Sequence, residues 1–295
     1  MPKNPTTADL AARYRITGGK HFRLKDHDPA DTWKLKSKDG AALLAQGVER
    51  LAELQKKLYA HDQWAVLLIF QAMDAAGKDG TIKHVMSGVN PQGCQITSFK
   101  TPSATELDHD FLWRSSCALP ERGRIGIFNR SYYEETLVVR VHPEILHTQR
   151  LPAKLVSKHI WRERFQDIAA YERHLGRNGT VVRKFFLHVS KAEQKRRFLA
   201  RLDEPAKNWK FSAGDLKERA RWDEYQAAYE ETIAHTATED APWHVIPADE
   251  KWFTHVAVMA VIIETLESLD LAFPKVDKAH RAELAAARTV LEGEE

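Results

Sequence analysis

The segment AMDAAGKDGT, which begins at Ala72, combines glycines, a lysine and two aspartates at a spacing close to that of a phosphate-binding loop. The usual form, G-x-x-x-x-G-K-[ST], surrounds phosphate oxygens with backbone N–H groups and a lysine, and its hydroxyl binds magnesium. Here Ala72 replaces the first glycine and Asp79 replaces the Ser or Thr. Lys78 is the cation expected to reach a transferred phosphoryl group.

The missing magnesium ligand of this loop has a candidate replacement within the loop itself. Asp74 lies four residues before Lys78, and hard cations such as Mg²⁺ bind carboxylate oxygens readily. An ordinary strand-to-helix turn with Asp74 as the helix cap is the alternative. The apolar run before the loop predicts a buried strand, and a helix is expected from near Gly80. That setting favours phosphate binding at the helix N-terminus.

A second polar cluster follows the apolar run RIGIF at residues 124–128. It contains Asn129, Arg130 and Glu134, and open α/β sheets bind ligands at the carboxyl ends of such strands. In phosphate-loop enzymes this strand usually ends in an aspartate that holds magnesium, whereas here it ends in Asn129. A surface strand end with an arginine salt bridge is the alternative interpretation.

A third candidate is the basic segment 183–210, in which nine Lys and Arg residues stand against three Asp and Glu residues. Arg197 and Arg201 share a helix face at i, i+4 spacing, with Arg196 beside them. The following sequence DEPAKNWKFS is typical of a closing loop, and an arginine-bearing lid can stabilise charge on a transferring phosphoryl group. A solvated helix face is the commoner origin of such a charge run.

The elements expected to hold these groups alternate along the chain. Strands are predicted at 64–70, 95–99, 124–128, 181–189 and 243–247, and helices at 41–60, 104–118, 152–175, 191–202, 215–235 and 251–271. Strands that alternate with helices indicate an α/β fold with a parallel sheet. Residues 1–40 are expected to form a mostly irregular N-terminal arm, and the tail from 275 is expected to form one last exposed helix.

Composition excludes several function classes. A net charge of +3 over 295 residues is too small for a dedicated nucleic-acid binder. Cys94 and Cys117 form no disulfide framework or thiolate zinc site, and the histidines lack zinc-binding spacing. No apolar run reaches membrane-spanning length, and no signal core opens the chain. We therefore expect a cytoplasmic protein that contacts neither membrane nor nucleic acid.

Four segments together, MDAAGKDGTIKHV, FNRSYYEE, FFLHVSKAEQKRRF and KNWKFSAGDLKERARWDEY, give the sequence a specific resemblance to the family-2 polyphosphate kinases over residues 16–271. The resemblance implies a three-layer phosphate-loop kinase fold, similar to thymidylate kinase, with a parallel central sheet and a helical lid. It implies phosphoryl transfer from inorganic polyphosphate to nucleotides with Mg²⁺ or Mn²⁺. The divisions expected are an arm (1–40), a phosphotransferase domain (41–272) whose lid spans about 196–222, and a helical tail (273–295).

Carried over to this chain, the resemblance implies roles for particular residues. Asp74, Lys78, Arg130 and Arg196 become catalytic candidates, and Asp74 also becomes the metal ligand. Most relatives have FDRSWY where this chain has FNRSYY; the Asn and Ala72 resemble the subgroup that phosphorylates both AMP and ADP, in which Glu134 helps to recognise the nucleotide. The implied substrate-binding residues are Ala75, Ala76, Gly77, Asp79, Gly80, Thr81, Lys83, Asn129, Glu134, Arg197, Arg201 and Lys210.

The function expected from the sequence is therefore polyphosphate-dependent phosphorylation of AMP and ADP, with guanine nucleotides as further candidate acceptors. The family is generally oligomeric, so a homodimer or homotetramer is expected. Two alternatives stay open: an ATP-dependent nucleoside monophosphate kinase, and a catalytically silent polyphosphate-binding protein, the latter suggested by Asn129.

Overall fold

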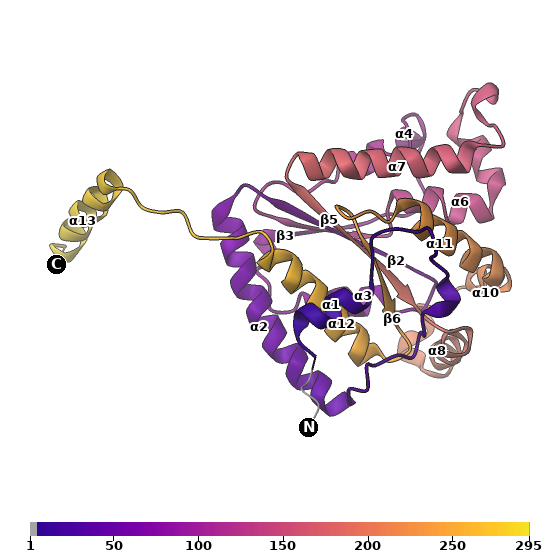
Figure 1. Cartoon of the computed structure of the whole chain (residues 1–295), viewed down its shortest axis with the longest axis horizontal. Coiled ribbons are helices and arrows are strands. Elements are labelled where there is room, and N and C mark those ends of the chain that lie inside the picture. Colours follow the sequence, from indigo (N-terminus) through magenta and orange to yellow (C-terminus); the bar gives the residue numbers. More distant parts are fainter. Residues whose placement is uncertain (1–4, 295) are drawn as a thin grey trace.

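The computed structural model describes residues 5–294 and confirms the α/β architecture, with one six-stranded sheet between two helical layers (Figure 1). The strand order is β1-β6-β5-β2-β4-β3, and every neighbouring pair is parallel except β1 with β6. The strands are β1 (Arg15–Ile16), β2 (Ala65–Ala72), β3 (Cys94–Ser98), β4 (Ile125–Asn129), β5 (Thr180–His188) and β6 (Trp243–Pro247).

Strand β2 lies at the centre of the sheet, between β5 and β4. All eight of its residues are buried, as expected for a parallel strand covered by helices on both faces. Its carboxyl end leads into the phosphate-loop candidate, and Phe70 pairs with Asn129 of β4. The loop and the second polar cluster therefore meet at one edge of the sheet.

Helices cover both faces of the sheet. On one side α2 (Ser37–His61) packs against α12 (Lys251–Glu267), and on the other α7 (Ile160–Arg177) packs against α11 (Trp222–Thr236) (Figure 1). The site is flanked by α3 (Lys78–Val85), α8 (Lys191–Asp203), α9 (Pro205–Asn208) and α10 (Ala213–Ala220). Shorter helices are α4 (Ala104–Leu107), α5 (Trp113–Ser116) and α6 (Val138–Val141).

The N-terminal arm is more regular than predicted. In its described part, α1 (Thr7–Arg13) begins with a capping box between Thr6 and Asp9. Helix α1 packs on α12, and its Leu10 is buried. Strand β1 then pairs antiparallel with β6 and forms one edge of the sheet. The hydrophobic pattern missed both elements because a seven-residue helix and a two-residue strand give too few positions for a period.

Four predicted helices are shorter or divided, and the one expected at 152–175 begins only at Ile160, as α7. The region 104–118 holds α4 and α5 rather than one helix, because the Asp110 side chain accepts the Leu112 N–H and begins a new turn. The region 215–235 is divided into α10 and α11 at Arg221. Helix α12 ends at Glu267.

The predicted C-terminal helix is present as α13 (Lys278–Glu292), which stands away from the body on an extended connection (Figure 1). All of its residues are exposed. Among the described residues, no helix combines the length and apolar character needed to cross a bilayer.

Candidate active site

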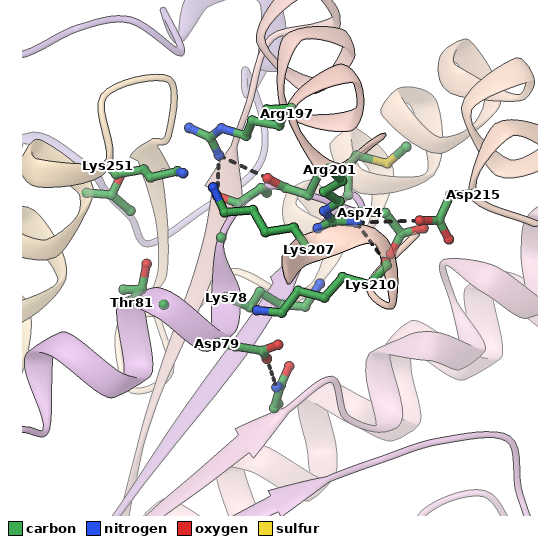
Figure 2. Close-up of a pocket in the computed structure, with 18 of the residues that line it drawn as sticks. Asp74, Lys78, Asp79, Thr81, Arg197, Arg201, Lys207, Lys210, Asp215 and Lys251 are labelled. Atoms are coloured by element: carbon green, nitrogen blue, oxygen red, sulfur yellow. Dashed lines mark hydrogen bonds and ion pairs between the residues drawn. The ribbon is translucent and has the colours of Figure 1, made fainter. Parts of the chain in front are cut away.

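A cavity of about 750 Å³ opens at the carboxyl ends of β2 and β4 (Figure 2). Its floor is the loop after β2, and its far wall comes from α8 and the lid. The structure brings nearly all of the predicted site residues to this cavity. Those that line it are Asp74, Ala75, Ala76, Gly77, Lys78, Asp79, Gly80, Thr81, Asn129, Arg130, Arg196, Arg197, Arg201 and Lys210.

The loop between β2 and α3 has an unusual backbone. Ala75 and Gly77 have positive φ angles of 62° and 106°, so left-handed residues alternate with others. Such an alternation is the backbone pattern of an anion-binding nest. The φ angle of Gly77 favours glycine, because residues with a side chain rarely adopt it. At Gly80 a Cβ would meet no atom within 4 Å, so space does not require glycine there. Helix α3 then begins at Lys78, with its N-terminus beside the cavity.

Lys78 lies in the inner part of this cavity. Its Nζ donates to the Ala72 carbonyl at 3.0 Å, which fixes the side chain across the loop. Burial lowers the pKa of Lys78 to about 8, and the nearby Arg130 guanidinium acts in the same direction, while Asp74 and Glu134 oppose the shift. An anionic phosphoryl group would restore the preference for the charged ammonium.

Arg130 connects the two polar clusters. Its Nη2 lies 3.1 Å from Asp74 Oδ1, and its Nη1 lies 3.0 Å from Glu134 Oε2. Glu134 in turn accepts from Gln71 Nε2 at 2.8 Å. The Glu134 carboxylate is the main cause of a pKa of Arg130 raised above its ordinary value. Glu134 therefore lies behind Arg130 and outside the cavity lining, where it orients the guanidinium.

The donors of Arg197 are engaged within the protein. This side chain is 6% exposed, and its Nε donates to Glu193. The terminal nitrogens donate to the carbonyls of Ala75, Ala76, Ala248 and Asp249. All five donors of an arginine are thus used within the protein. In this structure Arg197 holds the loop through the Ala75 and Ala76 carbonyls, and its predicted contact with substrate stays a prediction.

The other lid cations are available to an anion in the cavity. Arg196 is mostly exposed and pairs with Glu193, while Arg201 lies 3.5 Å from Asp215 of α10. Lys207, Lys210 and Lys251 point toward the loop from the lid and from α12 (Figure 2). Lys83 is exposed on α3 and does not line the cavity.

Lys251, Lys207 and Asp215 were missed as individual site residues. Lys207 and Asp215 fall in the segment already identified as a lid. Lys251 opens a helix more than 150 residues after the loop, and no motif marks it.

Comparison with known proteins identifies the family of the chain that forms this cavity. Residues 34–274 match the family described as Polyphosphate kinase 2. The chain belongs to the polyphosphate kinase 2 family. It is therefore a phosphotransferase, and the resemblance found in its motifs is confirmed.

Relatives of this family member cover most of its length. It is 58% identical to an ADP-polyphosphate phosphotransferase of Rhodopseudomonas palustris over 84% of this chain and 86% of the relative. It is 46% identical to an AMP/ADP-polyphosphate phosphotransferase of Meiothermus ruber over 90% of this chain and 97% of the relative. The crystal structure of Polyphosphate Kinase 2 from Arthrobacter aurescens TC1 superposes with a TM-score of 0.87 at 41% identity, covering 97% of each chain.

The carboxylates of this polyphosphate kinase 2 family member limit how a metal ion could bind. Residues 5–294 contain no group of three or more His, Cys, Asp or Glu side chains arranged to hold a metal. Asp74 faces the cavity, and Mg²⁺ in phosphotransferases is usually bound by one or two carboxylates together with substrate phosphates. The site fits a metal ion that binds together with substrate phosphates.

Proposed function

We propose that this enzyme transfers phosphoryl groups from inorganic polyphosphate to AMP and ADP, producing ADP and ATP. The observation that carries the proposal is the distribution of charge in the cavity. The nest and Lys78 form its inner end, and the outer wall carries cations from the lid and α12. A donor that is a chain of repeated phosphates matches cations spread along the whole cavity, whereas one terminal phosphate would need only the inner end.

The protein groups contribute mainly position and charge. Lys78 and the loop N–H groups hold the transferring phosphoryl group, and Arg130 contacts phosphates on the acceptor side. Arg196 and Arg201 neutralise charge on the donor chain from the lid. Asp74 would hold Mg²⁺ or Mn²⁺, which would supply positive charge to offset the charge of the phosphates.

Two acceptors can share one such site. The polyphosphate donor has no base or sugar to fix its register, so it can shift by one phosphate unit when ADP replaces AMP. The names of two relatives support this proposal, since one is an ADP-polyphosphate and the other an AMP/ADP-polyphosphate phosphotransferase. Guanine nucleotides are a further acceptor class to be tested with the same assay.

A one-pot phosphorus NMR assay tests the proposal. Purified protein is incubated with Mg²⁺, polyphosphate and AMP, and in parallel with ATP in place of polyphosphate. We expect ADP and then ATP only when polyphosphate is present. Product with ATP as the donor and none with polyphosphate would favour a nucleoside monophosphate kinase. Salt-dependent binding of polyphosphate without any product would favour a silent binding protein.

The predicted homo-oligomer is a separate proposal. Light scattering during size-exclusion chromatography measures the molar mass of the protein directly. A monomeric mass at micromolar concentration would contradict it.

A further inference from the structure

Three successive carbonyl groups of the phosphate loop are held by one helix. Gln194 Nε2 donates to the Asp74 carbonyl at 2.9 Å. Arg197 Nη1 donates to the carbonyls of Ala75 and Ala76 at 3.0 and 2.8 Å. Both side chains project from α8, three residues apart, and so lie on the same helix face.

These bonds determine what the loop presents to a phosphate. A peptide unit is planar, so fixing the direction of its carbonyl oxygen also fixes the direction of its N–H. The carbonyls are directed toward α8. The Ala76 N–H donates within the loop to the Met73 carbonyl at 3.2 Å, which leaves the N–H groups of Ala75 and Gly77 to face the cavity. A carbonyl oxygen turned the other way would place a negative dipole against the phosphate and would weaken the nest.

Gln194 differs from Arg197 because it also contacts the lid. It is 1% exposed, and its Oε1 accepts from Arg219 Nη1 at 2.7 Å. Arg219 lies in α10 and donates as well to the Lys191 carbonyl at 2.9 Å. The same helix carries Asp215, which lines the cavity and pairs with Arg201. One buried amide therefore joins the loop backbone to the lid.

We propose that Gln194 and Arg219 form a positioning bridge, through which the lid helix α10 fixes the orientation of the Asp74 peptide group in the phosphate loop. Neither residue is a catalytic residue, because both act through the loop backbone. When α10 is in place, Arg219 fixes the Gln194 amide and the loop keeps its N–H groups toward the anion. When α10 moves away, the amide loses one of its two partners and the loop loses a restraint.

The amide group is suited to this position because it donates and accepts at once. Gln194→Glu keeps an acceptor for Arg219 but loses the donor to Asp74, whereas Gln194→Met loses both bonds at similar volume. Arg219→Ala removes the lid side of the bridge from a partly exposed position, where the fold is less at risk. Lys195→Ala is the matched control, because Lys195 is the exposed neighbour of Gln194 on the same helix.

The first measurement is kinetic and rests on the proposed function. For each variant, kcat with polyphosphate and AMP is compared with the Kd of polyphosphate from calorimetry. We expect kcat to fall about tenfold in Gln194→Met and Arg219→Ala, the scale of one or two hydrogen bonds, while Kd changes less than about threefold. The double variant should be no slower than Gln194→Met alone, because the two side chains act as one unit. Lys195→Ala should match the wild type.

The second measurement does not depend on phosphoryl transfer. Amide hydrogen exchange of residues 74–81 is followed with and without polyphosphate. In the wild type we expect polyphosphate to protect these amides, and in Arg219→Ala we expect that protection to be reduced although polyphosphate is bound.

Three results would overturn the bridge: wild-type kcat in both single variants, independent multiplying effects in the double variant, or unchanged protection of the loop in Arg219→Ala. If Gln194→Met does not fold, Arg219→Ala decides the question alone. A wild-type protein that binds polyphosphate without transferring it would contradict the proposed function, and the exchange experiment would still decide whether the bridge exists.

Discussion

Asn129 donates its side-chain amide to Asp79 Oδ1 at 2.6 Å, which joins the end of β4 to the first turn of α3. Both residues depart from the usual pattern of phosphate-loop enzymes, with an Asn where an Asp is common and an Asp where a Ser or Thr is common. These two unusual residues contact each other, because the Asn129 amide donates a hydrogen bond to the Asp79 carboxylate.

Asn129→Asp is predicted to make the protein dependent on cations for stability. The change would place two carboxylates in contact, and like charges raise the pKa of one of them. We expect a lower Tm at pH 8 without metal, with recovery when Mg²⁺ is added or the pH is lowered. Thermal unfolding with and without Mg²⁺ measures this effect. A Tm equal to that of the wild type in the absence of metal would show that the contact is not maintained in solution.

Lys78→Ala is predicted to lower kcat by about 10² or more, the scale for one preorganised charge at the reacting group. Lys78→Arg keeps the charge but changes its position, so a smaller loss is expected. Steady-state assays with polyphosphate and AMP give both values. Turnover near that of the wild type in Lys78→Ala would remove this lysine from the mechanism.

The lowered pKa of Lys78 predicts how activity and stability depend on pH. With a pKa of about 8 in the folded protein, the ammonium of the free enzyme is lost as pH rises through 8, so kcat/KM should fall on that alkaline limb. The unfolded chain keeps this proton up to about 10.5, so between these pH values it binds more protons than the folded chain. The Lys78 contribution to the free energy of unfolding therefore rises with pH in this window.

A pH profile of kcat/KM for the wild type and Lys78→Arg checks this prediction. The arginine stays charged throughout, so its profile should lack the decline near pH 8. A decline that is the same in both proteins would have to arise from another group.

Lys184 is predicted to determine stability and not substrate binding. It is fully buried, and its Nζ contacts Glu172 Oε2 at 2.5 Å and the Thr236 carbonyl at 2.7 Å. Lys184→Met leaves the buried Glu172 carboxylate without its counter-charge and should cost about 3–5 kcal/mol. Adding Glu172→Gln removes that charge and should restore part of the loss. Urea unfolding of both variants measures the difference, and a loss no larger than that of a surface substitution would contradict this role.

The sequence predicted the site better than it predicted the tasks of individual cations. The loop and the strand end could be located because a buried strand followed by glycine and lysine has few other uses, and parallel strands end at one edge. Helical spacing placed Arg197 and Arg201 on one face but could not show that Glu193 and four backbone carbonyls, two of them in the loop, would take every donor of Arg197. The count of charges in the basic segment 183–210 likewise included Lys184. This lysine is instead paired with Glu172 on α7, which only the fold brings near.

Asp215 is predicted to weaken the binding of polyphosphate to the open cavity. Its carboxylate lies 3.5 Å from Arg201 and adds a negative charge to a wall that otherwise attracts the polyanion. Asp215→Asn removes that charge and frees Arg201, so we expect the Kd of polyphosphate to fall about fivefold at low salt, the scale of one partly exposed ion pair. Calorimetric titrations at two salt concentrations measure the change, which should shrink as salt screens the charges. Asp203→Asn, an exposed change at the end of α8, is the control. If Asp215→Asn instead binds polyphosphate more weakly, then Asp215 holds Arg201 in its phosphate-binding position, and the ion pair serves the donor chain directly.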